Sequence, residues 1–285
     1  MSKIAVTGAG GQLGRELCRQ HRSVVGLSRE ALPLTDAGAV RRRLETLRPR
    51  VLINAAAFTQ VDAAESDPVA CRAVNVRGVR HLAEVCRDID CALVQISTDY
   101  VFAGSTSRGR PFREDDPPAP QGVYATTKFE AERIAAELPS HLIVRTCGLY
   151  ASGDHAEAGN FVNTILRLAR DGRHLRIVND QMCTPSFVPH VAEAVLFLVD
   201  AAIGGNAPWG TYHVANSGET TWYQFAKELC RQAAVEATLE PISSEAYGAA
   251  APRPAYSVLD TTKYREAGGP ELPSWQQGLA DRLSV

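Results

Sequence analysis

The sequence lacks several features that would each define a class of protein. No apolar run reaches the roughly 18 residues that a membrane-spanning helix needs. The first residues run directly into a short apolar segment, without the pattern of a signal peptide. The 30 basic and 32 acidic residues nearly cancel, which argues against nucleic acid or an anionic membrane as a partner. We therefore expect a cytoplasmic protein that binds neither.

Metal-binding and redox motifs are also missing. The seven cysteines contain no C-x-x-C pair, and no two histidines are spaced as H-x-x-x-H, so we expect no metal site. The cysteines are expected to be reduced and mostly buried. Lysine is scarce, because only four of the 30 basic residues are lysines. Lys128 is therefore conspicuous in a chain that otherwise uses arginine.

Short, continuous apolar runs alternate with longer amphipathic stretches in the first half of the chain. Residues 4–6, 24–27, 51–54, 92–96 and 142–144 are predicted strands, and 12–21, 37–47, 68–88 and 123–137 are predicted helices. Continuous apolar strands are typical of a parallel sheet that helices cover on both faces. The sequence therefore predicts an α/β fold with a Rossmann-type, doubly wound parallel sheet.

The second half has a looser pattern, which predicts a smaller second domain built from C-terminal segments. We assign 1–155 to the larger domain, with 185–216 returning to it, and 156–184 and 217–285 to the smaller domain. Residues 103–122 contain four prolines and the acidic run Glu114-Asp115-Asp116. This segment is expected to be a long surface loop whose acidic run faces solvent.

A glycine-rich turn follows the first predicted strand and opens the first predicted helix. Gly8, Gly11 and Gly14 form the pattern G-x-x-G-x-x-G. Glycine at these positions allows a tight turn, close approach of a pyrophosphate, and close packing of the helix on the strand. The helix N-terminus adds amide donors and a positive dipole end for the anion. This context predicts dinucleotide binding.

The end of the second predicted strand bears on which dinucleotide binds. NAD sites usually have an acidic residue there, which binds the ribose 2′-hydroxyl. Here the strand is followed by Ser28 and Arg29, and a guanidinium suits a 2′-phosphate. NADPH is therefore favoured, although Glu30 lies one residue further and keeps NADH open.

A tyrosine and a lysine lie four residues apart in a predicted helix. Tyr124 and Lys128 would share one helical face. A phenol has a pKa of about 10, and we expect the Lys128 ammonium to lower the pKa of Tyr124. The fourth predicted strand ends in Ser97, Thr98 and Asp99. Because ligands bind at the carboxyl ends of strands in this kind of fold, we expect these side chains beside Tyr124.

Together these residues resemble the extended short-chain dehydrogenase/reductase family, and within it the reductases of nucleotide-linked 4-keto-6-deoxyhexoses. The resemblance covers nearly the whole chain and is most specific in the runs 97–102 and 218–223. It implies that 1–155 is an NADP-binding Rossmann domain and that the smaller C-terminal domain binds the substrate. It implies three catalytic residues, namely Thr98, Tyr124 and Lys128. It implies that the cofactor is bound by Gly8, Gly11, Gln12, Leu13, Gly14, Ser28, Arg29, Ala55, Ala56, Ala57, Ser97, Tyr124 and Lys128. The implied substrate-binding residues are Thr98, Asp99, Tyr124, Gly148 and Arg253.

The resemblance implies specific roles and shows specific departures. Tyr124 would donate a proton, and Arg253 would meet the nucleotide diphosphate. Gly148 replaces an aromatic residue of the family, Cys183 departs from a family glycine, and Tyr256 replaces a smaller polar residue. All three departures lie where the substrate would be recognised.

The activity that the resemblance implies is NADPH-dependent reduction of the C4 keto group of a nucleotide-linked 4-keto-6-deoxyhexose. The substrate expected in particular is dTDP-4-dehydro-L-rhamnose, reduced to dTDP-L-rhamnose, and a homodimer stays open. One alternative is a non-catalytic NADP-binding regulatory subunit. Another is an epimerase or dehydratase of the same fold. Asp99 and Tyr100 follow Thr98, where a dehydratase usually has Asp-Glu, and this counts against the dehydratase.

Overall fold

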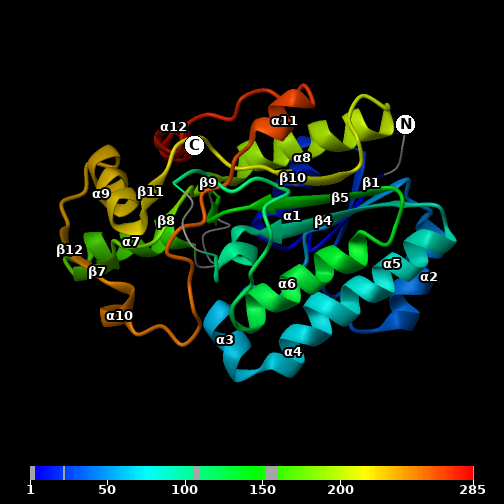
Figure 1. The fold of residues 1–285 in the computed structure, drawn as a ribbon, viewed down its shortest axis with the longest axis horizontal. Coiled ribbons are helices and arrows are strands. Elements are labelled where there is room, and N and C mark those ends of the chain that lie inside the picture. The colour runs from blue at the N-terminus through cyan, green and yellow to red at the C-terminus, as the bar shows by residue number, and fades with distance from the viewer. Residues whose placement is uncertain (1–3, 22, 106–108, 152–159, 285) are drawn as a thin grey trace.

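A six-stranded parallel sheet forms the centre of the larger part of the molecule (Figure 1). The computed structural model describes residues 4–21, 23–105, 109–151 and 160–284. The strands of this sheet are β1 (Ile4–Thr7), β2 (Val24–Leu27), β3 (Val51–Asn54), β4 (Ala92–Thr98), β5 (His141–Thr146) and β10 (Gly210–His213). Their order is β10-β5-β4-β3-β1-β2, and every pairing is parallel.

The direction of winding reverses between β1 and β3. The chain places β2 on one side of β1 and then continues through β3, β4 and β5 on the other side. In open parallel sheets, ligands bind outside the carboxyl ends of the strands at such a switch point. The topology therefore places the candidate site beyond the ends of β1 and β3.

Helices cover both faces of the sheet. On one face lie α1 (Gln12–Gln20) and α8 (Val188–Ile203), and on the other lie α2 (Ala37–Leu47), α5 (Gly78–Asp88) and α6 (Gly122–Ala135) (Figure 1). Along β1, Ile4 and Val6 pack on the first face and Ala5 packs on the second. Because both faces are buried, the strands are apolar without alternation. The predicted doubly wound α/β fold is confirmed.

The sheet is completed by a segment from the second half of the chain. Helix α8 packs against α1, and β10 then pairs with β5 along the outer edge. A short parallel pair precedes this return, formed by β6 (Leu149–Tyr150) and β9 (Ser186–Phe187). Residues 188–213 thus belong structurally to the sheet and its helices.

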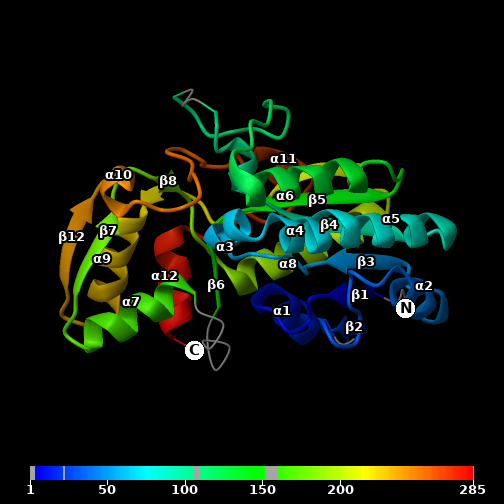
Figure 2. The same ribbon diagram turned by 90° about the horizontal axis from the view of Figure 1, so that it is seen from below.

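A smaller assembly lies beside the sheet (Figure 2). It contains α7 (Phe161–Arg170), β7 (His174–Val178), β8 (Met182–Cys183), β11 (Thr220–Thr221), α9 (Trp222–Gln232), β12 (Thr238–Ile242), α10 (Ser244–Tyr247) and α12 (Trp275–Leu283). Its own apolar core is centred on Phe225, whose ring lies 5.7 Å from that of Trp275. The boundary predicted at residues 155 and 156 falls outside the described residues.

The predicted helix over 68–88 is not uniform. It consists of α4 (Pro68–Arg72), the π-helical turn η1 (Ala73–Arg77) and α5, and it follows the short helix α3 (Val61–Ser66). Asn75 is buried in this π-helical turn and bonds the backbone of Phe58 through both ends of its amide, at 2.8 and 3.2 Å. A π-helical turn is common at functional sites. Here it directs a buried amide at the loop after β3.

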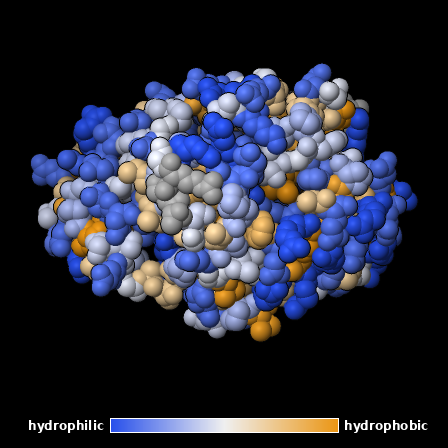
Figure 3. Space-filling model, viewed as in Figure 1, coloured by the Kyte–Doolittle hydropathy of each residue, from blue (hydrophilic) through white to orange (hydrophobic). Residues whose placement is uncertain are grey.

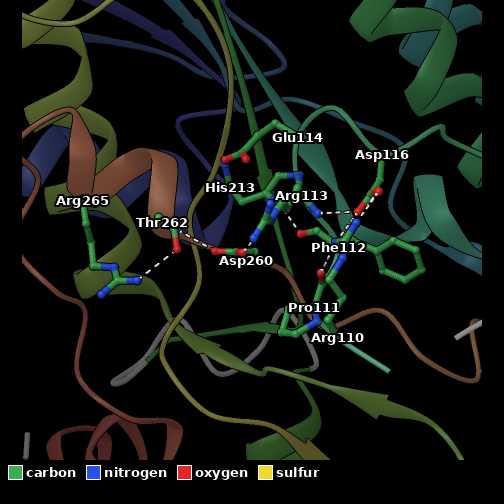
Figure 4. A network of polar contacts seen from close by, with 10 residues as sticks. All are labelled: Arg110, Pro111, Phe112, Arg113, Glu114, Asp116, His213, Asp260, Thr262 and Arg265. Atoms are coloured by element: carbon green, nitrogen blue, oxygen red, sulfur yellow. Dashed lines mark hydrogen bonds and ion pairs between the residues drawn. The ribbon is translucent and has the colours of Figure 1, made fainter. Parts of the chain in front are cut away.

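The prediction that the acidic run faces solvent is wrong for two of its three residues (Figure 4). Asp116 is buried, forms a two-pronged ion pair with Arg110 at 2.8 and 2.9 Å, and accepts the Arg113 amide. Glu114 accepts the backbone amide of His213 at 2.8 Å, and burial raises its pKa. The loop folds back over the sheet edge, which a charge pattern alone does not reveal.

The remaining elements and the surface are ordinary for a globular chain. The short helices η2 (Asp99–Phe102) and α11 (Thr262–Glu266) complete the fold. The face in Figure 3 is mostly hydrophilic, with scattered apolar residues. Among the described residues, Val69 and Tyr247 are the exposed large hydrophobic side chains. No helix in that part of the chain is long and apolar enough to cross a membrane.

Candidate functional site

The predicted glycine turn lies at the switch point. Gly8 has a φ of +69°, and a Cβ there would stand 2.7 Å from the Ala56 nitrogen. A Cβ on Gly14 would collide with the Gly8 carbonyl. Gly11 is the N-cap of α1 and provides no side-chain cap for the helix, so the first amides of α1 stay available to an anion. The turn thus has the shape that a bound pyrophosphate requires.

The two residues after Gly11 have different surroundings. The Gln12 side chain accepts the Ala151 amide at 2.9 Å and the Asn160 side-chain amide at 3.0 Å, so it ties α1 to the segment after β6. Leu13 is buried in the core between α1 and the sheet. Contact of either residue with a pyrophosphate would therefore come through the backbone.

The loop after β3 lies directly against the glycine turn. Ala55, Ala56 and Ala57 are half-buried there. Their path is fixed by Asn54, which is fully buried, accepts Thr7 Oγ1 at 2.6 Å and donates to Gln95 Oε1 at 2.8 Å. Buried polar groups that are fully paired give a rigid local structure. The structure therefore brings the predicted cofactor-lining alanines to the predicted glycines.

The end of β2 presents the predicted cofactor-selecting residues at the surface. Arg29 is exposed, and Ser28 is half-buried and accepts the Ala31 amide at 3.3 Å. The pKa of Glu30 is lowered, chiefly by a hydrogen bond with Ser28. The Arg29 guanidinium is thus accessible at the end of β2, beside the glycine turn.

Helix α6 places Tyr124 and Lys128 against the end of β4. Lys128 is buried, and its Nζ donates to the Ile96 carbonyl at 2.6 Å. Thr98 lies at the tip of β4, where its hydroxyl hydrogen-bonds with Tyr124 and accepts the Tyr100 amide at 3.2 Å. The ring of Tyr124 meets that of Tyr100 edge to face, with 5.9 Å between centroids. Thr98 and Tyr124 are therefore in contact, and Lys128 lies against β4 two residues before Thr98.

The expectation that Lys128 lowers the pKa of Tyr124 is wrong for this structure. Burial raises the pKa of Tyr124 above its usual value, and the Thr98 hydrogen bond offsets only part of this rise. Burial also lowers the pKa of Lys128, to about 8. Because the Lys128 Nζ is directed at the Ile96 carbonyl, the sequence spacing alone overstates its effect on the phenol. Tyr124 is therefore protonated at neutral pH.

Asp99 is held by protein groups. It is 2% exposed, accepts Ser257 Oγ at 2.6 Å and is also hydrogen-bonded to Thr98 at 3.2 Å. Burial raises the pKa of its carboxyl group. One edge of Asp99 lines a small cavity of about 60 Å³, together with residues that include Cys147 and Cys183. Asp99 thus borders this small cavity beside the tip of β4.

Gly148 lies at the same cavity, but another side chain fills the space above it. Its φ is +52°, and a Cβ there would stand 3.0 Å from the Trp222 ring and 3.1 Å from Pro185 Cα. Trp222 comes from α9 in the smaller assembly and also lines the cavity. The aromatic surface that the sequence lacks at position 148 is supplied by Trp222.

Arg253 forms an ion pair with Asp62. Its two terminal nitrogens meet the two Asp62 oxygens at 2.6 and 2.7 Å. This hydrogen bonding holds the pKa of the Asp62 carboxyl at about 2. Asp62 belongs to α3 and Arg253 to the segment after α10, so the pair joins distant parts of the chain. Arg253 therefore has a fixed orientation beside α3.

Sequence reasoning missed several partners of the site. Ser257 comes from far along the chain, and no local signal marks it. Trp222 lies in the run 218–223 that carries the resemblance, but nothing local indicates that its ring lies over Gly148. Glu132 is different, because it follows Lys128 by four residues and bonds Ser97 at 2.5 Å. The helical spacing that identified Tyr124 and Lys128 extends to Glu132 and would have found it.

Comparison with known proteins gives consistent similarities. Residues 2–285 match the family model described as the RmlD substrate binding domain. The chain is 43% identical over 283 residues to dTDP-4-dehydrorhamnose reductase of Streptomyces griseus, covering 97% of this chain and 91% of that protein. It is 38% identical to the spore coat polysaccharide biosynthesis protein SpsK of Bacillus subtilis, covering 99% and 97%.

Solved structures agree with these sequence matches. A crystal structure of dTDP-4-dehydrorhamnose reductase from Bacillus anthracis in complex with NADP superposes with a TM-score of 0.92, at 32% identity, covering 99% of both chains. The resemblance to the extended short-chain dehydrogenases and reductases is thereby confirmed. The chain belongs to the RmlD substrate-binding-domain family, whose model it matches over almost its entire length.

Proposed function

We propose that the protein is an NADPH-dependent reductase of the C4 keto group of a nucleotide-linked 4-keto-6-deoxyhexose, most specifically dTDP-4-dehydro-L-rhamnose. The observation that carries the proposal is the placement of Tyr124 and Lys128 on α6 against the end of β4, where Thr98 hydrogen-bonds with Tyr124. The relatives named dTDP-4-dehydrorhamnose reductase, and the one crystallised with NADP, support the substrate and cofactor. The product would be dTDP-L-rhamnose.

The residues fit a dinucleotide. Gly8, Gly11 and Gly14 leave room for a pyrophosphate at the open N-terminus of α1, with the backbone of Gln12 and Leu13 beside it. Ala55 to Ala57 would lie along the cofactor, Ser28 and Arg29 would take its 2′-phosphate, and Ser97 and Lys128 would face its nicotinamide end. NADPH, when bound, supplies the hydride for the C4 carbon.

The protein supplies the proton and the orientation. Tyr124 holds its proton at neutral pH and would give it to the C4 oxygen, while the Thr98 hydroxyl orients that oxygen. The Lys128 ammonium, one helical turn away, would hold the nicotinamide ribose. Lys128 has a pKa of about 8, so it is mainly charged at pH 7.

The smaller assembly would bind the sugar nucleotide. We assign 1–155 and 185–216 to the cofactor-binding domain and the rest to a substrate-binding domain, supported by the separate core around Phe225. The exception within 217–285 is α11, which contacts β10 and whose Tyr264 packs in the core of the sheet. Arg253, oriented by Asp62, would meet the diphosphate through the guanidinium N–H groups that Asp62 does not engage, including Nε. Asp99 and Gly148 would lie at the hexose.

The direct test is to mix the protein with NADPH and a panel of nucleotide 4-keto sugars and to follow absorbance at the reduced nicotinamide band. We expect oxidation of NADPH with dTDP-4-dehydro-L-rhamnose and slower oxidation with other bases or sugars. Tight NADPH binding without turnover on any sugar would instead favour a non-catalytic regulatory subunit. Isomerisation without net oxidation would favour an epimerase.

Cofactor choice depends on Arg29. NADPH is expected to bind more tightly than NADH, because a charge-assisted contact to the 2′-phosphate contributes about 1.5–3 kcal/mol. Arg29→Asp should narrow or reverse this preference, measured as dissociation constants by fluorescence titration. Because Arg29 is exposed, its replacement should leave Tm unchanged. If the wild type and Arg29→Asp each bound NADPH and NADH equally well, the assignment of Arg29 to the 2′-phosphate would be contradicted.

Trp222 should control sugar binding without affecting the cofactor. Its ring lies over Gly148, so Trp222→Ala enlarges the cavity and removes aromatic surface from the hexose. We expect KM for the sugar nucleotide to rise about tenfold, which corresponds to a loss of about 1.4 kcal/mol, while the NADPH dissociation constant stays unchanged. Trp209→Ala, remote from this cavity, is the matched control. Weaker NADPH binding with an unchanged KM would show that this segment has been misplaced.

A further inference from the structure

A buried ion pair joins α6 to β5, one helical turn beyond Lys128. It has no part in the mechanism proposed above. Glu132 in α6 and Arg145 in β5 meet with 2.8 Å between carboxylate and guanidinium, and both side chains are 4% exposed. A second contact, from Arg145 Nε to Glu132 Oε1, measures 3.0 Å. Buried ion pairs rarely add net stability, so their presence calls for another explanation.

The carboxylate of Glu132 has two neighbours from the proposed site. Ser97, directly before Thr98, donates its hydroxyl to Glu132 Oε1 at 2.5 Å. Lys128 lies four residues before Glu132 on α6, so the two buried side chains share one helical face. A single carboxylate therefore links the tip of β4 to the face of α6 that bears Tyr124 and Lys128.

We propose that Glu132, held by Arg145, is a positioning residue that fixes Ser97 and places a negative charge one helical turn from the Lys128 ammonium. The inference rests on the proposed function, because it assigns the ammonium a role in NADPH binding. Burial disfavours the charged form of Lys128, and the Glu132 carboxylate favours it. Loss of the carboxylate should therefore lower the pKa of Lys128.

Other groups near this pair do not replace the carboxylate. The groups concerned are the Cys71 thiol from α4, which faces Lys128; Asp99 from η2, which acts on Tyr124; and His213 from β10, which faces Arg145. Burial raises the pKa of Cys71 and lowers the pKa of His213 to about 3, so both are uncharged at neutral pH. His213 accepts from Arg145 through Nε2 and donates to the Phe112 carbonyl through Nδ1. Glu132 is thus the carboxylate that acts on Lys128.

The test measures NADPH affinity against pH for Glu132→Gln. NADPH is an anion, so its affinity should fall as pH rises through the pKa of Lys128. In Glu132→Gln we expect this fall to begin about one pH unit lower than in the wild type. Glu132→Asp, which keeps the charge, should restore the wild-type profile. Glu130→Gln is the matched control, since Glu130 lies on the same helix in an exposed ion pair with Arg72.

A second variant separates a folding defect from the expected shift in the pH profile of NADPH affinity. Glu132→Gln leaves the Arg145 charge buried without its partner, whereas Glu132→Gln/Arg145→Met removes both charges together. Folding of each variant is checked by circular dichroism and Tm. The double variant should fold and show the same downward shift in the pH profile.

The outcomes are distinct. If the pH profile of NADPH affinity in the folded double variant superposes on that of the wild type, the inference is overturned. It is also overturned if Glu130→Gln shifts this profile as much as Glu132→Gln does. The sugar panel reports separately on the proposed function. A shifted NADPH profile without turnover on any 4-keto sugar would reject the reductase and keep the role of Glu132. Turnover on a 4-keto sugar, together with an unshifted NADPH profile in the folded double variant, would keep the reductase and reject the role of Glu132.

Discussion

A Tyr124→Phe protein should bind NADPH as the wild type does and lose turnover by about 10²-fold or more. The change removes the hydroxyl that hydrogen-bonds with Thr98 and keeps the ring that packs on Tyr100. A positioned proton donor contributes roughly 10²–10⁴-fold to such a reaction. The measurement is kcat with saturating NADPH and 4-keto sugar, with the NADPH dissociation constant measured in parallel.

Tyr264→Phe provides the control for the loss of a phenolic hydroxyl. The Tyr264 hydroxyl is buried, remote from the site and has no hydrogen-bond partner among the described residues, so its removal should leave kcat unchanged. Thr98→Ala should be milder than Tyr124→Phe, because the proton donor remains. A Tyr124→Phe protein that reduces the sugar at the wild-type rate would end the proposed mechanism.

Gly14→Ala should weaken both the fold and the cofactor site. The new Cβ would collide with the Gly8 carbonyl and come within 3.0 Å of Ala9 Cα, and these atoms belong to backbone that cannot rotate away. Overpacking of this kind costs about 1–3 kcal/mol of unfolding free energy. Because the turn must shift, we also expect NADPH to bind at least about tenfold more weakly, which corresponds to about 1.4 kcal/mol.

The neighbouring Gly10→Ala gives the matched comparison. A Cβ at Gly10 would meet no atom of the described residues within 4 Å, so this variant should keep the wild-type Tm. Thermal unfolding and NADPH titration of both proteins measure the difference. If Gly14→Ala matched Gly10→Ala in both measurements, close backbone approach would not be what requires glycine at position 14.

Much of the fold could be predicted because its signals are local. Each central strand is apolar on both faces, and the glycine turn marks the first crossover. The π-helical turn at 73–77 escaped prediction, because a single extra residue per turn does not disturb the apolar pattern of the flanking helices. The buried acids of the loop escaped for another reason, since their partners Arg110 and His213 become neighbours only when the loop folds back.

The candidate site divides in the same way. Residues that follow a strand end or share a helical face, such as Thr98, Tyr124 and Lys128, were placed together by topology alone. Contacts between distant segments were not, and Ser257 reaches Asp99 across 158 residues. Ionisation also depends on tertiary burial, which is why the i, i+4 spacing gave the wrong direction for the pKa of Tyr124. The local sequence pattern thus identifies the candidate catalytic side chains, and tertiary packing determines their ionisation.

The late return of the chain to its sheet affects how the protein can be made and divided. Strand β10 pairs with β5 through residues 68 apart, as Arg145 and His213 illustrate. During synthesis β5 therefore emerges well before the strand that covers it, and its unpaired edge is open to association with other chains. A fragment ending near residue 155 would keep that edge permanently exposed. It should aggregate on expression, whereas a fragment that continues through β10 would close the sheet.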